Sequence, residues 1–104
     1  MKVKLLTKEI EKQLMKNPIG CNNNLSICKF FNPYGAGTWW VFEGEKLANG
    51  DWEFYGIAEI YDREFGYFTL SELESARVNV FGVKMPLERD KYYTPETKEE
   101  IINN

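Results

Sequence analysis

Residues 52–73 read W-E-F-Y-G-I-A-E-I-Y-D-R-E-F-G-Y-F-T-L-S-E-L, and this stretch decides the fold that the sequence predicts. Aromatic and aliphatic side chains alternate with other types over Trp52–Tyr61, a pattern that predicts a long β-strand. The glycine and the acidic residues of Asp62–Gly66 indicate a turn, and Tyr67–Leu70 predicts a second strand. The stretch therefore predicts an antiparallel strand pair that leads directly into a helix.

The sequence S-E-L-E that begins at Ser71 fits a helix capping box, with Glu74 three residues after the cap. We interpret Ser71 as this cap and not as a nucleophile. The helix is expected to end near Arg77. Residues 78–83 are expected to form a short strand or an extended segment, and residues 86–90 a loop.

Alternation in the long strand divides its residues between two faces of a sheet. One face, which carries the larger aromatic residues and glycine, is the expected core face. The other combines carboxylates with tyrosines and an isoleucine, and tyrosine is common at interface hot spots. We predict that this second face is partly exposed and binds a partner. With the turn that follows, the predicted partner-binding residues are Glu53, Tyr55, Ile57, Glu59, Tyr61, Asp62 and Glu64.

The rest of the chain adds a helix and two strands. Thr7 is expected to cap a helix that continues to about Met15, because apolar residues recur there every four positions. Strands are predicted over Leu25–Phe31 and Thr38–Glu43, joined by a turn that contains proline and two glycines. The second strand carries two adjacent tryptophans, which must point to opposite faces of the sheet.

These elements predict one α+β domain over residues 1–104: a small antiparallel sheet of about four strands, an N-terminal helix, and a short helix after the last long strand. Residues 92–104 are predicted to form a C-terminal segment in which Tyr92, Tyr93 and Pro95 fold back onto the body. Its end, from Lys98 onward, is expected to be frayed.

Composition limits the classes of function. The chain has 104 residues, of which 43% are hydrophobic and 15% aromatic, enough for a core without metals or disulfides. The net charge of -3 gives no general attraction to nucleic acid. The charge is unevenly spread, because residues 1–16 hold five lysines and two glutamates, whereas residues 43–74 hold nine acids and two basic residues.

Catalytic and metal-binding signatures are absent from the sequence. There is no histidine, so histidine-based nucleophile pairs and H-E-x-x-H metal sites are excluded. Cys28 is interpreted as a buried thiol, and two cysteines without histidine cannot form a zinc site. We expect no cofactor. The remaining catalytic alternative is a metal-dependent hydrolase built on clustered carboxylates, for which the candidates are Glu43, Glu59, Asp62 and Glu64.

A nucleic-acid-binding function is the second alternative. It would use the basic N-terminal helix and its lysines, Lys4, Lys8, Lys12 and Lys16. No segment contains the roughly 20 apolar residues that a membrane span needs, and no signal-peptide pattern is visible. We therefore expect a cytoplasmic protein that does not bind membranes.

Five segments of the chain occur together in a distinctive order: L-L-T-K-E-I (Leu5–Ile10), F-F-N-P-Y-G-A-G-T-W (Phe30–Trp39), F-Y-G-I-A (Phe54–Ala58), E-F-G-Y-F-T-L-S-E-L-E (Glu64–Glu74) and P-L-E-R-D-K-Y-Y (Pro86–Tyr93). The order resembles a family of small bacterial and phage proteins classed as a domain of unknown function. G-Y-F-x-L-S-E-L-E and P-x-E-R-D are the most specific motifs. The resemblance implies a compact domain encoded on plasmids, conjugative elements or prophages, and it supplies no activity and no site residues.

The resemblance and the composition together favour a non-enzymatic accessory protein of a mobile element that binds another protein. An inhibitor of a host defence nuclease complex, anti-CRISPR or anti-restriction, is the specific form of this hypothesis. Within the P-x-E-R-D motif, Arg89 lies between two acids. We interpret it as an anchor that ties the C-terminal segment to the body, with a binding edge as the alternative.

Overall fold

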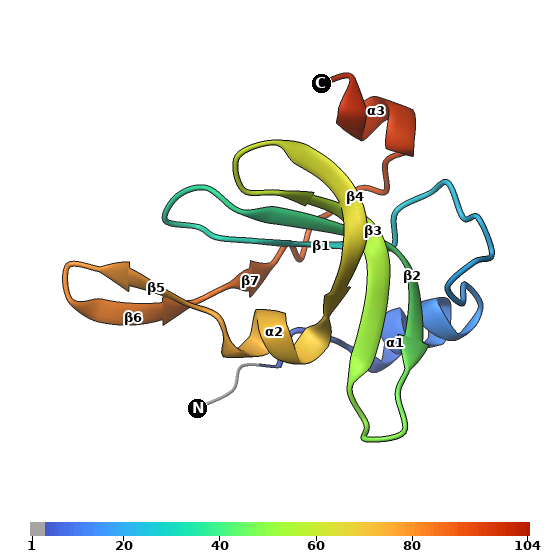
Figure 1. The fold of residues 1–104 in the computed structure, drawn as a ribbon, viewed down its shortest axis with the longest axis horizontal. Helices are drawn as coiled ribbons and strands as arrows, with labels where there is room; N and C mark the ends of the chain where they lie inside the picture. Colours follow the sequence, from blue (N-terminus) through green and yellow to red (C-terminus); the bar gives the residue numbers. More distant parts are fainter. Residues whose placement is uncertain (1–3) are drawn as a thin grey trace.

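The computed structural model describes residues 4–104 as an α+β fold (Figure 1). A helix is followed by four strands, a second helix, three shorter strands and a third helix. In chain order these elements are α1 (Lys8–Met15), β1 (Cys28–Phe31), β2 (Thr38–Lys46), β3 (Trp52–Glu59), β4 (Arg63–Thr69), α2 (Leu70–Ser75), β5 (Arg77–Val80), β6 (Val83–Pro86), β7 (Glu88–Arg89) and α3 (Lys98–Ile102). None of the helices in this range is long and apolar enough to cross a membrane.

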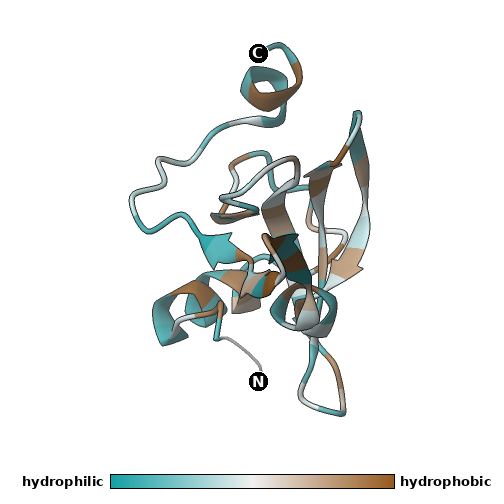
Figure 2. Ribbon diagram, turned by 90° about the vertical axis from the view of Figure 1, so that its left-hand side faces the viewer, coloured by the Kyte–Doolittle hydropathy of each residue, from teal (hydrophilic) through white to brown (hydrophobic). Residues whose placement is uncertain are grey.

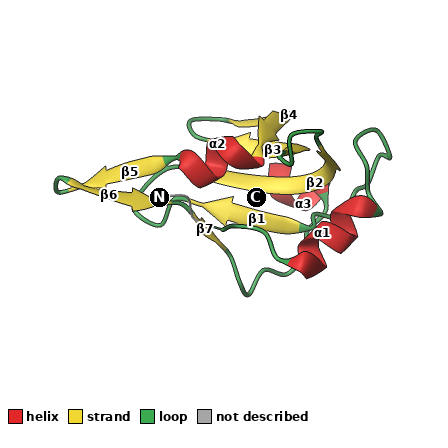
Figure 3. Ribbon diagram, turned by 90° about the horizontal axis from the view of Figure 1, so that it is seen from below, coloured by secondary structure: helices red, strands yellow, loops and turns green. Residues whose placement is uncertain are grey.

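Five strands form one antiparallel sheet in the order β4-β3-β2-β1-β7, and β5 pairs with β6 in a separate hairpin (Figure 3). The predicted α+β class, the N-terminal helix and the short helix after the last long strand are confirmed. The main sheet has five strands because β7 pairs with Phe30 and Phe31 of β1. The expectation of a loop over residues 86–90 is therefore wrong at Glu88 and Arg89, and also at Pro86, the last residue of β6.

The first hydrophobic core lies on one face of the sheet, under α1 and α2. Leu14 of α1 and Leu73 of α2 pack there with buried residues of the strands. Phe54 is at the centre, with its ring centroid 6.2 Å from that of Phe30 and 5.9 Å from that of Phe68. Gly44 brings α1 close to the sheet, because a β-carbon at this position would lie 3.0 Å from a methyl carbon of Leu14.

The centre of the sheet requires a glycine at position 56. A β-carbon on Gly56 would lie 1.9 Å from the carbonyl oxygen of Trp40, so no other residue fits where β2 and β3 approach this closely. The β2–β3 register shifts immediately afterwards, between Val41 and Glu43, where Phe42 forms a β-bulge. Trp40 and Phe42, two positions apart, lie together on the second face of the sheet, whereas Trp39 packs against the first core.

The second helix begins earlier than predicted. Thr69, not Ser71, is the N-cap, and it forms a capping box with Glu72. The overlapping sequences T-x-x-E and S-x-x-E both fit the pattern, but Ser71 has another partner. Its backbone N–H and its hydroxyl both donate to Asp51, at 3.0 and 2.6 Å. The tertiary contact with Asp51 therefore decides which residue caps the helix.

Two turns also differ from the prediction. The turn between β3 and β4 contains residues 60–62, so β4 begins at Arg63 and the predicted turn over residues 62–66 is wrong. Residues 78–83 are not one extended segment, because the chain reverses at Phe81 and Gly82 to form the β5–β6 hairpin. Both turn residues have positive φ, 51° for Phe81 and 83° for Gly82. Tight hairpin turns require this conformation, which is uncommon for phenylalanine.

A second core covers the other face of the sheet, where the C-terminal segment packs. It contains Trp40, Phe42, Ile57 and Ile101, with Tyr93 beside them. The expected frayed end from Lys98 onward is instead α3, whose capping box joins Thr97 to Glu100. Hydrophobic residues on α3 and on the strands appear brown in Figure 2. Arg63 fastens the end of this helix by donating to the carbonyl oxygens of Ile101 and Asn104.

We expect Ile101→Ala to destabilise the protein by about 2–4 kcal/mol, because the side chain is only 1% exposed and lies against Trp40. Chemical denaturation followed by tryptophan fluorescence measures this loss. Ile102→Ala is the matched control, since Ile102 is 42% exposed, and it should change the free energy of unfolding by less than about 0.5 kcal/mol. Equal small effects of both substitutions would contradict the packing of α3.

Candidate binding surfaces

Three aromatic side chains form a strip on the second face of the sheet, beside the part that α3 covers. Tyr55 of β3 stacks on Phe65 of β4 with ring centroids 6.3 Å apart, and its ring is 5.1 Å from that of Tyr67. Phe65 is 46% exposed and Tyr67 is 63% exposed. We call Tyr55, Phe65 and Tyr67 the aromatic strip. Large rings held this far open to solvent are typical of surfaces that bind a partner.

The aromatic strip lies between two charged regions. On one side, Glu53 is opposite Glu45 in the β2–β3 register, so two carboxylates share the same face. On the other side, the Arg63 guanidinium donates to Glu59 at 3.0 Å and lies over the Trp40 ring. The ammonium of Lys98 approaches the covered side of Tyr55, 6.0 Å from its centroid. The unpaired charge beside the strip is thus mainly negative.

The seven predicted partner-binding residues do not form one continuous surface in the structure. Glu53 and Tyr55 belong to the strip and its acidic side. Ile57 is fully buried beneath α3, and Glu59 is paired with Arg63. The remaining three residues lie at the β3–β4 turn, where they line a hollow of about 280 Å³ with Ala58 and Ile60: Tyr61, Asp62 and Glu64.

The sequence prediction omits Phe65 because it assigns residues 62–66 to a turn, and it omits Tyr67 because the predicted partner-binding residues end within that turn. The signal was present in the sequence: R-E-F-G-Y-F-T alternates in the same way as the strand before it. A three-residue turn after Glu59 brings Tyr67 opposite Tyr55 and Phe65 opposite Ile57. The aromatic residues of both strands then meet on one face.

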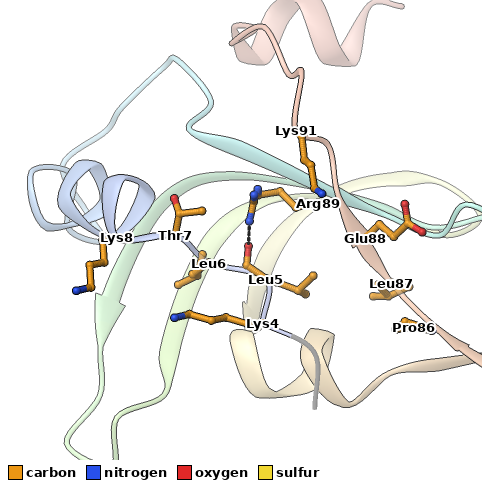
Figure 4. Close-up of a pocket in the computed structure, with 10 residues that line it drawn as sticks. All are labelled: Lys4, Leu5, Leu6, Thr7, Lys8, Pro86, Leu87, Glu88, Arg89 and Lys91. Carbon is orange, nitrogen blue, oxygen red and sulfur yellow. Dashed lines mark hydrogen bonds between the residues drawn. The ribbon is translucent and has the colours of Figure 1, made fainter. Parts of the chain in front are cut away.

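A basic groove lies at the other end of the sheet, between the N-terminal segment and β7 (Figure 4). Its volume is about 830 Å³, and buried leucines at positions 5, 6 and 87 are among its lining residues. The charged residues of the lining are four basic side chains and one acid: Lys4, Lys8, Arg89, Lys91 and Glu88. A groove with this charge balance on an acidic protein is suited to an anionic ligand.

The groove contains only two of the four lysines predicted to contact nucleic acid. Lys4 and Lys8 line it, whereas Lys12 and Lys16 are exposed elsewhere on the N-terminal helix and the residue that follows it. Lys2, which belongs to the basic N-terminal segment, lies outside the described residues. Arg89 donates to the carbonyl oxygen of Leu5 at 2.7 Å. It therefore fixes the N-terminal segment against β7, a different anchor from the one expected.

The candidate carboxylates do not form a metal site. Within residues 4–104, no group of three or more acidic or cysteine side chains is placed to hold a metal ion. Glu43 is 3% exposed, and its two oxygens accept backbone N–H groups of Gly20 and Asn23 at 2.8 and 3.0 Å. Its carboxylate is thus committed to holding the loop between α1 and β1.

Two side chains have raised pKa values, the buried Cys28 of the first core and the half-buried Tyr93 beside the second core. Burial raises the pKa of Cys28 to about 12, although Arg89 opposes the shift, so the thiol is protonated at neutral pH. Burial also raises the pKa of Tyr93 to about 12. Tyr93 is hydrogen-bonded to Ser26, which also exchanges hydrogen bonds with the backbone of Glu96. The hydrogen bonds of Ser26 to Tyr93 and Glu96 anchor the segment that leads to α3.

The fold and its surfaces define a small α+β domain with an aromatic strip and a basic groove at opposite ends of one sheet. The chain belongs to the family described as "Protein of unknown function (DUF2958)", whose model matches residues 5–101. This match confirms the resemblance to a domain of unknown function. Searches of the curated proteins and of the solved structures found no significant match to the chain.

We expect Glu43→Ala to destabilise the protein by about 2 kcal/mol, because two backbone N–H groups of the loop lose their acceptor. Urea denaturation measures the change. Glu45→Ala on the same strand is the control, since Glu45 is exposed and should tolerate the substitution within about 0.5 kcal/mol. If Glu43→Ala left stability unchanged, the carboxylate would not be the anchor of this loop.

Proposed function

We propose that this protein is a non-enzymatic, cytosolic binding protein that docks a basic surface of another protein on its aromatic strip. The observation that carries the proposal is the exposure of Phe65 and Tyr67 next to the acidic pair Glu45 and Glu53. The rings would supply apolar contact area, and the carboxylates would select a basic partner. Tyr55, half-buried between the rings and Lys98, holds the strip in one geometry.

The specific form of this proposal is the inhibition of a nuclease complex of a host defence system. Proteins that act on nucleic acid have basic grooves that bind phosphate. An acidic, aromatic surface could occupy such a groove in place of the nucleic acid, because stacking and negative charge are the features that the groove recognises. Support for this form comes from the charge and the aromatic character of the strip, and from the mobile-element setting that the sequence resemblance implies.

The test of this proposal is capture of a protein from nuclease-treated host lysate by tagged variants. We expect Tyr67→Ala and Glu53→Lys to weaken capture at least tenfold, because truncating a central aromatic residue or reversing a charge removes a main contact. Tyr92→Ala is the matched control, since Tyr92 is 93% exposed and lies away from the strip, and it should capture the partner normally. Undiminished capture by folded Tyr67→Ala would refute the strip as the binding surface.

The basic groove supports a second candidate function, binding of single-stranded nucleic acid through phosphate contacts. Lys4, Lys8 and Lys91 line a hollow of about 830 Å³ with Arg89, whose planar guanidinium also binds phosphate. The groove lies at the β7 end of the sheet, away from the strip at the β4 end. The two candidate functions are therefore separable by substitution.

Binding of a fluorescent single-stranded oligonucleotide, measured by anisotropy, tests the second candidate. Three lysine–phosphate contacts predict a slope of about −2 for log K against log salt concentration. Lys4→Glu and Lys91→Glu should abolish binding, whereas Lys84→Glu, on the β6 strand of the separate hairpin, should retain most of it. An affinity that does not depend on salt would exclude this function.

A further inference from the structure

The strand β4 forms one end of the main sheet, and no other strand within residues 4–104 pairs with its outer side (Figure 3). Among the described residues, the backbone of residues 63–68 forms hydrogen bonds only with β3. Charged side chains occur only at the first two positions of the strand, and its register with β3 continues without a bulge. Exposed edges usually carry lysine, proline or a bulge that prevents pairing with another chain. The Phe65–Thr69 part of β4 has none of these features.

The direction of the free backbone groups follows from the hydrogen-bond alternation across the sheet. The N–H of Asn32 donates to the carbonyl oxygen of Gly37 at 2.8 Å, and these residues continue the β1–β2 register. Every second residue of a strand directs its backbone N–H and C=O groups to the same side. Trp39, two residues after Gly37, therefore directs its backbone groups toward β1. Trp40, one residue further, directs its groups toward Ile57 of β3.

The same alternation continues through β3 to the edge strand. Because Ile57 points toward β2, its neighbour Gly56 points toward β4 and is bonded to Gly66. The residues on either side of Gly66, which are Phe65 and Tyr67, therefore direct their N–H and C=O groups outward. The N–H of Thr69, which has the same direction, is accepted by the Glu72 carboxylate at 3.1 Å and not by β3.

The open edge is complementary to itself. If a second copy is placed antiparallel with Gly66 opposite Gly66, the outward groups of Phe65 meet those of Tyr67 of the second copy, and the reverse. The two glycines form a pair without mutual hydrogen bonds, the kind in which two strands approach most closely. A β-carbon on Gly66 would meet nothing within 4 Å in one copy, so its surroundings are open. No like charges face each other in this register, because Arg63 is opposite Thr69 and Glu64 is opposite Phe68.

We propose that two copies of this chain pair antiparallel through β4, with the two-fold axis at Gly66, and form one continuous sheet of ten strands. Phe65 and Tyr67 belong to the same face, so they form cross-strand aromatic pairs with Tyr67 and Phe65 of the second copy. The two aromatic strips then join across the axis into one surface. The dimer does not depend on the proposed binding of a basic partner, since only the edge of β4 creates it.

Disulfide trapping of Gly66→Cys in a Cys21→Ser background tests the register directly. Facing residues of this kind have α-carbons about 4.5 Å apart, within the range of about 4.4–6.8 Å that a disulfide spans. Cys28 is buried and remains as it is. We expect mild oxidation of purified protein to convert most of the variant into a covalent dimer. Glu64→Cys is the matched control: it lies on the same face of the same strand, but its α-carbons would be about 14 Å apart along the paired strands, so it should not cross-link.

Sedimentation equilibrium of purified Tyr67→Ala and Tyr67→Pro distinguishes the contribution of the backbone N–H to dimerisation from that of the side chain. Both variants lack the ring, but only proline removes the outward N–H, and neither loses a hydrogen bond to β3. We expect Tyr67→Pro to dimerise at least tenfold more weakly than Tyr67→Ala, with unchanged circular dichroism. The inference is overturned if the wild-type protein is monomeric at 100 µM or assembles beyond a dimer, or if Glu64→Cys cross-links as readily as Gly66→Cys. A monomer that still captured a partner would leave the proposed function intact.

Discussion

The close approach of the paired strands β2 and β3 at Gly56 is the constraint on which the rest of the structure depends. With the Trp40 carbonyl oxygen 1.9 Å from the place of a β-carbon, the two strands approach each other only because residue 56 is glycine. A bulge follows at Phe42, and Trp40 and Phe42, two positions apart in β2, lie on the same face of the sheet. The apolar side chains of Trp40 and Phe42 on that face are shielded from solvent by α3. The bulge also turns Glu43 toward the loop that it holds.

The predictable part of the fold is the part that local pattern determines. Alternation over residues 52–59 and the spacing of apolar residues in α1 are properties of neighbouring residues, and both elements were found. The bounds of β4 and α2 were shifted because two solutions fitted the local pattern equally well. For α2, the contact of Ser71 with Asp51, which is twenty positions away, selects Thr69 as the cap. Such long-range contacts are not visible in a single sequence.

The C-terminal helix α3 also depends on contacts between residues that are far apart in the sequence. T-K-E-E at residues 97–100 is a capping box, yet five helical residues are too few to be stable without tertiary packing. The packing comes from Ile101 against Trp40 and from Arg63, which donates to the last carbonyl groups of the helix. This cover also explains why only part of the predicted partner-binding face stays open. Ile57 is lost beneath α3, while Phe65 and Tyr67, further along the sheet, remain exposed.

The two ends of the main sheet differ in how they resist pairing with other chains. At one end, β7 has only two residues, both charged, and such short charged edges do not recruit another strand. At the other end, β4 is seven residues long and presents Phe65, Gly66 and Tyr67 without a charge. If both ends were open, copies would add at each end and a fibre would grow. With one open end of the main sheet, pairing about a two-fold axis uses that edge in both copies, so the main sheet offers no edge for a third. The asymmetry of the sheet thus favours a closed dimer, in which the aromatic strips lie at the centre and the basic grooves at the outer ends.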